Sequence, residues 1–132
     1  MIPPLYWNDE AFRVELLDQT LLPVEERWIP IETPEQMAEA IRKLRVRGAP
    51  AIGIAASYGV VLALRAPESH VEMVRKAIAL LRQTRPTAVN LFGALRRMEA
   101  VADAYATADR HTLAQRLLAD ARAFERDDRE AG

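Results

Sequence analysis

Residues 45–65 read RVRGAPAIGIAASYGVVLALR, and this stretch decides the fold. None of the sixteen residues from Ala49 to Leu64 is charged, whereas an arginine stands at each end of the stretch. The run is shorter than the roughly 20 apolar residues that cross a bilayer, so we expect no membrane span. A helix that is apolar on all sides is typical of the centre of a helical protein. We therefore expect a buried helix that begins at Pro50.

The composition is that of one folded domain without a strong electrostatic character. The 132 residues are 50% apolar and 28% charged, which suits a modest core. A net charge of −1 gives no broad basic surface for nucleic acid. The absence of cysteine excludes disulfides, thiolate zinc sites and a cysteine nucleophile in this chain. Its first residues lack the basic and then apolar pattern of a secretory signal.

Upstream of the buried helix the sequence has the period of β-strands. Residues 12–18 (FRVELLD) alternate apolar and charged side chains, as a half-buried strand does. A second alternation occupies residues 25–32 (EERWIPIE), where the proline indicates an edge strand. A third short strand is possible near residues 5–7. The sequence thus predicts a small antiparallel sheet of two or three strands within residues 1–32.

A helical period begins after this sheet. Thr33 is a capping residue, Pro34 suits the first helical position and Gln36 completes a capping box. This combination predicts the start of a helix, which we expect to end at Gly48.

Three further helices are expected after the buried one. Ser69 and Glu72 form a second capping box, and the helix that they start should end near Thr84, because the residue before Pro86 avoids the helical conformation. Two more helices should begin at about Ala88 and after Asp109. The residues that we expect to face the core are Met37, Ala40, Ile41, Leu44, Val71, Val74, Ile78, Leu81, Leu91, Leu95, Met98, Ala102, Tyr105, Leu113, Leu117, Ala121 and Phe124.

The expected fold is therefore α+β, with a sheet followed by a bundle of four to five helices. Residues 1–32 form the sheet subregion, and residues 33–121 form the helical bundle of the same domain. Residues 122–132 are highly charged and continue the helical pattern. Such a segment is typical of a connector to a further domain.

Two loops each place an arginine just before a helix. They are residues 47–50 (RGAP), with Arg47 and Gly48, and residues 85–88 (RPTA), with Arg85. The first amides of a helix lack internal partners and carry a partial positive charge, so a helix start beside a guanidinium can bind a phosphate. The alternative is structural: arginine near the end of the preceding helix complements its negative end, and glycine and proline are ordinary helix boundaries.

Other polar residues are weaker candidates. His70 and His111 are isolated, each in the first turn of a helix without metal-ligand spacing, so we expect solvated side chains and no metal site. Tyr58 is either a core aromatic with one hydrogen bond or a hydroxyl in a pocket. Thr87 is a helix cap or a ligand to an anion, and Asn90 lies on a polar helix face or reaches a ligand. No complete catalytic constellation is present.

Three motifs, in this order, carry a resemblance to a known family. They are LDQTLLP at residues 17–23, VRGAPAIGIAA at residues 46–56 and RPTAVNL at residues 85–91. The chain from about Leu5 to Glu125 resembles the N-terminal region of methylthioribose-1-phosphate isomerases. Ribose-1,5-bisphosphate isomerases and the regulatory subunits of a translation-initiation exchange factor belong to the same superfamily.

The resemblance implies a reaction and a set of site residues. The family converts methylthioribose 1-phosphate, an aldose, into methylthioribulose 1-phosphate, a ketose, in methionine salvage, without a metal or an organic cofactor. By resemblance, the substrate-contacting residues of this chain are Arg47, Gly48, Ala49 and Arg85. The resemblance also implies a cytoplasmic homodimer whose partner molecule is a phosphorylated sugar.

One departure from the family concerns catalysis. Its catalytic cysteine and acidic residue lie in a following Rossmann-like domain, which is absent from these 132 residues. We therefore expect the N-terminal half alone, with no catalytic residue and no turnover of its own. An interaction module like the regulatory relatives, a ribose-1,5-bisphosphate isomerase and a phosphosugar sensor remain alternatives.

Overall fold

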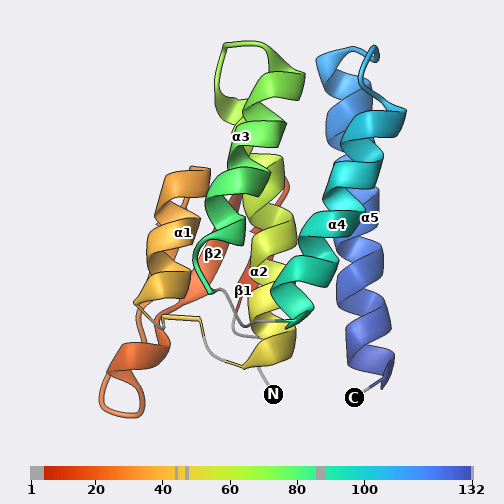
Figure 1. The fold of residues 1–132 in the computed structure, drawn as a ribbon. Helices are drawn as coiled ribbons and strands as arrows, with labels where there is room; N and C mark the ends of the chain where they lie inside the picture. The colour runs from red at the N-terminus through yellow and green to blue at the C-terminus, as the bar shows by residue number, and fades with distance from the viewer. Residues whose placement is uncertain (1–4, 44, 47, 86–88, 132) are drawn as a thin grey trace.

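The computed structural model describes residues 5–43, 45–46, 48–85 and 89–131, which form a small sheet beside a group of helices (Figure 1). The predicted α+β class is confirmed. The elements are strands β1 (Leu5–Asn8), β2 (Arg13–Leu17) and β3 (Trp28–Ile31), helices α1 (Pro34–Arg42), α2 (Ala49–Val61), α3 (His70–Arg82), α4 (Val89–Ala104) and α5 (Arg110–Ala131), and 3-10 turns at Gln19–Leu21 and Leu62–Arg65.

The sheet is antiparallel with the strand order β1-β2-β3. Leu5 pairs with Leu16, and Val14 pairs with Ile31, so these four side chains share one face. All four are buried, which places that face against the helices. Pro30 is exposed in the edge strand β3, as the alternation predicts.

Helix α2 lies at the centre of the molecule. Every residue from Ile52 to Val61 is buried, and the helix contacts α1, α3, α4, α5 and β1 (Figure 1). The prediction of a surrounded helix is therefore confirmed, although α2 begins at Ala49, one residue earlier than expected. Across the described residues, we find no helix whose length and apolar character would suffice to cross a membrane.

The helical periods correctly identify most of the core. Of the residues expected to face inward, Val71, Tyr105 and Phe124 are half-buried, and Leu44 lies outside the described residues. The others are buried: Met37, Ala40, Ile41, Val74, Ile78, Leu81, Leu91, Leu95, Met98, Ala102, Leu113, Leu117 and Ala121.

The predicted end of α1 at Gly48 is wrong. The helix ends at Arg42, and the Arg45 amide then donates to the Ala40 carbonyl at 2.9 Å, which turns the chain out of the helix. The Arg45 guanidinium lies 3.3 Å from the carboxylate of Asp18. This contact with a residue far back in the sequence holds the chain in its new direction.

The helix starts predicted at Ser69 and after Asp109 differ in their capping, and Ala88, where a third start was expected, lies outside the described residues. The Ser69 side chain makes no capping hydrogen bond, and only its carbonyl accepts from the Met73 amide. Helix α5 follows Asp109, as expected, and the Asp109 carboxylate accepts from the Thr112 amide at 2.7 Å, a cap that was not predicted. Helix α3 ends at Arg82, two residues before the expected end.

Two further expectations concern the later part of the chain. The expectation that His70 is merely solvated is wrong, because its Nε2 donates to the Ala108 carbonyl at 2.8 Å. His111 is exposed, as expected. Residues 122–131 continue α5 without a break, and their role as a connector stays a prediction.

Candidate functional site

The amino-terminal ends of α2 and α4 lie side by side at one end of the molecule (Figure 1). A methyl carbon added to Gly53, in the second turn of α2, would lie only 3.1 Å from the backbone oxygen of Asn90, in the first turn of α4. Both helices begin at this end, so both direct their partial positive charge toward it. This end of the molecule therefore favours an anion.

Gly48 precedes α2 in a conformation that other residues rarely adopt. Its φ is 93° and its ψ is 135°, in a region open almost only to glycine. Gly48 is exposed, and a Cβ atom at this position would have no neighbour within 4 Å. The glycine is thus required by the backbone rather than by crowding, and it leaves the helix start open to a ligand.

The first turn of α2 presents amide donors to solvent. The first hydrogen bond within the helix runs from the Ile52 amide to the Gly48 carbonyl at 3.0 Å. The amides of Ala49 and Ala51 precede that bond, and Pro50 has no amide proton. Ala49 is exposed, and the amides of a helix's first turn are typical anion donors.

Arg85 lies at the same end of the molecule, in the connection from α3 to α4. It is half-buried and follows Thr84, whose hydroxyl donates to the Leu81 carbonyl at 2.7 Å and fixes the end of α3. Arg47 and Thr87 lie outside the described residues. Joint binding of one anion by Arg47 and Arg85 therefore stays a prediction.

The chain segment that leads into α2 is held in place by the buried carboxylate of Asp18. Burial raises the pKa of Asp18, but hydrogen bonds from the Thr20 hydroxyl and amide, together with the Arg45 guanidinium, outweigh burial and keep the pKa below its ordinary value. Asp18 is thus charged at neutral pH and holds Arg45, three residues before Gly48. Asp18 of the LDQTLLP motif therefore binds the residue that directly precedes the VRGAPAIGIAA motif.

Tyr58 is a core aromatic, as one of the two sequence interpretations held. It is 1% exposed, its ring stacks on Trp7 with the centroids 5.6 Å apart, and its hydroxyl donates to the carboxylate of Glu125 at 2.8 Å. Sequence reasoning missed Glu125. The available signal was its position four residues after Ala121, on the buried face of α5.

Val89 is a second residue near the site that sequence reasoning missed. It is the first residue of α4 and is 78% exposed. Asn90, for which the sequence left two interpretations open, is half-buried, and its backbone oxygen lies close to Gly53. The sequence offered one signal for Val89, because it is an apolar residue within the RPTAVNL motif that begins with Arg85.

Among the residues that the structure describes, no three histidine or acidic residues are placed to hold a metal ion. What the described site offers is amide donors, one guanidinium and apolar surface. This set can bind a phosphate ester, and it supplies no general base of its own.

Comparisons with known proteins agree with the motifs. Residues 45–132 match the Initiation factor 2 subunit family. The chain is 44% identical over 132 residues to 5-deoxyribose 1-phosphate isomerase of Bacillus cereus, covering 96% of this chain and 38% of that protein. It is 48% identical over 128 residues to methylthioribose-1-phosphate isomerase of Heliobacterium modesticaldum, and the match covers 93% of this chain and 36% of that protein. The resemblance that the motifs carry is confirmed.

Solved structures give the same result. The 5-methylthioribose 1-phosphate isomerase of Pyrococcus horikoshii superposes with a TM-score of 0.85 at 30% identity, covering 94% of this chain and 36% of that one. Subunit delta of translation initiation factor eIF-2B from A. fulgidus superposes with a TM-score of 0.87 at 35% identity, covering 98% of this chain and 38% of that one. The chain spans well under half the length of these relatives. It belongs to the Initiation factor 2 subunit family.

Proposed function

We propose that the chain is the substrate-binding part of an isomerase that converts a 5-substituted ribose 1-phosphate from an aldose to a ketose. Two of the relatives are named for 5-deoxyribose 1-phosphate and methylthioribose 1-phosphate. These sugars share the phosphate on C1 and differ at C5. Our finer proposal is methylthioribose 1-phosphate as substrate, in methionine salvage, with a cytoplasmic homodimer as the active form.

The observation that carries this proposal is the exposed start of α2 at Gly48, beside the start of α4. A phosphate accepts hydrogen bonds from helix amides and from a guanidinium, and the buried body of α2 holds its amides rigidly. Ala49 and Arg85 lie at the same end and supply these two kinds of donor. Arg47 is proposed to add the second guanidinium.

The isomerisation moves hydrogen from C2 to C1 without a net gain or loss of atoms. It needs an acid and a base within hydrogen-bond reach of those carbons and their oxygens. We assign neither role to a residue of this chain. The binding residues hold the phosphate, and the proton carriers are expected in the part of the longer relatives that this chain does not span.

The test is substitution of Arg85 by alanine in a protein of the relatives' full length. Loss of a charged hydrogen bond to phosphate costs about 1.5–3 kcal/mol, so the KM for methylthioribose 1-phosphate should rise about 10- to 100-fold. Arg47→Ala should act in the same direction. Arg96→Ala is the matched control, because Arg96 is an exposed arginine farther along α4.

A second candidate function is assembly without catalysis. The family name and the TM-score of 0.87 with subunit delta of eIF-2B favour it. Turnover separates the two candidates. The assembly function predicts that a protein of the relatives' full length does not convert methylthioribose 1-phosphate at all. If it does convert the sugar but Arg85→Ala and Arg47→Ala leave the KM at the value of Arg96→Ala, the proposed phosphate site is wrong.

A further inference from the structure

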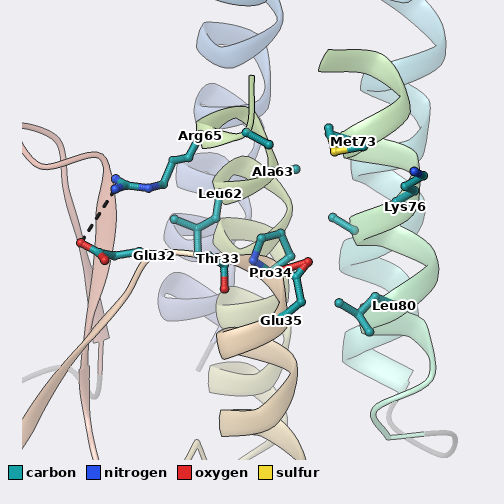
Figure 2. Close-up of a pocket in the computed structure, with 12 residues that line it drawn as sticks. Glu32, Thr33, Pro34, Glu35, Leu62, Ala63, Arg65, Met73, Lys76 and Leu80 are labelled. Atoms are coloured by element: carbon teal, nitrogen blue, oxygen red, sulfur yellow. Dashed lines mark ion pairs between the residues drawn. The ribbon is translucent and has the colours of Figure 1, made fainter. Parts of the chain in front are cut away.

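A groove of about 530 Å³ lies between α1 and α3, away from the site described above (Figure 2). Its floor is Leu62 and Ala63, which follow the carboxyl end of α2. Helix α2 has 13 residues, so at about 1.5 Å per residue the groove is roughly 20 Å from Gly48. The groove and the phosphate site are therefore separate.

The walls of the groove are mainly apolar. Met73, Ala77 and Leu80 form one stripe along α3, at positions i, i+4 and i+7. Met73 and Leu80 are half-buried and point from α3 toward α1 in Figure 2. Pockets of about 300–1,000 Å³ with apolar walls and a few polar groups bind small molecules. The groove has this size and character.

Two of the four charged residues that line the groove are already paired. Glu32 lies 3.8 Å from Arg65 and 3.2 Å from Arg13. The Arg65 guanidinium also donates to the carbonyls of Ala11 and Phe12, at 2.8 and 2.7 Å, and it points away from the groove toward Glu32 (Figure 2). Glu32 and Arg65 therefore join β3 and the β1–β2 loop to the end of α2.

The other two charged residues are Glu35 and Lys76, on opposite walls. Glu35 comes from the first turn of α1, and its carboxylate faces the space between α1 and α3 in Figure 2. Lys76 comes from α3, next to Ala77. Neither side chain forms an ion pair or a hydrogen bond with any residue that the structure describes. One negative and one positive charge thus flank an apolar space.

We infer that this groove binds a small zwitterion with an apolar side chain, namely an apolar α-amino acid. Its ammonium group pairs with Glu35, its carboxylate pairs with Lys76, and its side chain lies on Met73 and Leu80. An apolar amine would leave Lys76 unpaired, and an apolar acid would leave Glu35 unpaired. The inference is independent of the proposed isomerase function, because it uses none of the phosphate-site residues.

Methionine methyl NMR tests the inference on the 132-residue chain, with L-leucine as the probe at millimolar concentration. The Met73 methyl signal should shift, whereas that of Met98 should not, because Met98 is fully buried in α4 and does not line the groove. The matched probes are 4-methylpentanoate, which lacks the ammonium group, and 3-methylbutylamine, which lacks the carboxylate. Each should bind about tenfold more weakly than L-leucine.

Two substitutions complete the test. Glu35→Gln and Lys76→Gln should each weaken L-leucine binding about tenfold. Glu72→Gln and Lys43→Gln should not, because these exposed residues lie outside the groove. The inference is overturned by a Met73 signal that does not respond, by equal binding of the three probes, or by loss of the shift in the full-length protein.

Discussion

At the scale of single residues, Gly48 determines how the chain enters α2. With φ at 93° and ψ at 135°, an alanine would be strained by about 1–3 kcal/mol, and Gly48→Ala should lower the free energy of unfolding by that amount. Gly93→Ala is the control. Neither position has an atom within 4 Å of an added Cβ, but Gly93 lies inside α4, where alanine should stabilise by about 0.5–1 kcal/mol. Urea unfolding measures both effects, and equal effects would contradict the assignment.

Asp18 gives a residue-scale prediction that depends on pH. Because its pKa is lowered in the folded state, its contribution to stability is complete above the unfolded value of about 3.9 and is lost as the pH falls through the folded pKa. Asp18→Asn should therefore be less stable than the parent chain at about pH 7, by about 1–3 kcal/mol, and the difference should shrink at about pH 3. Urea midpoints at the two pH values measure this. A difference that stays constant would exclude a lowered pKa.

At the scale of elements, the packing of α2 depends on Gly53. A Cβ atom there would lie 2.9 Å from the Phe124 ring of α5 and 3.1 Å from the Asn90 carbonyl of α4. The ring can move aside, but the carbonyl is backbone, so Gly53→Ala should separate α2 from α4 and cost about 1–3 kcal/mol. Thermal unfolding measures the loss. An unchanged midpoint would show that the two helix starts do not lie this close.

The elements also show how far sequence reasoning extends. Apolar periodicity predicted the strands and the inward faces of the helices, because both follow from local geometry and burial. The cap at Thr33, whose hydroxyl accepts from the Gln36 amide, was predicted because it involves only neighbouring residues. The end of α1 was not, since it depends on Arg45 meeting Asp18 across the fold. The groove between Glu35 and Lys76 was missed for the same reason: its walls are distant in sequence.

At the scale of the whole molecule, two helix starts share one end of a bundle built around α2 (Figure 1). The sequence identified both loops as candidate anion sites, and the structure brings their described residues, Gly48 and Arg85, to that end. Sequence alone could not place them together, because the contact between α2 and α4 is a property of the packed bundle. The proposed site follows from that packing.

A crystal structure of the full-length protein with its ketose product bound tests the central claim most directly. The account predicts the phosphate within about 3.2 Å of the Ala49 amide and the Arg85 guanidinium. A phosphate bound at a distance from the amino-terminal end of α2 would contradict it.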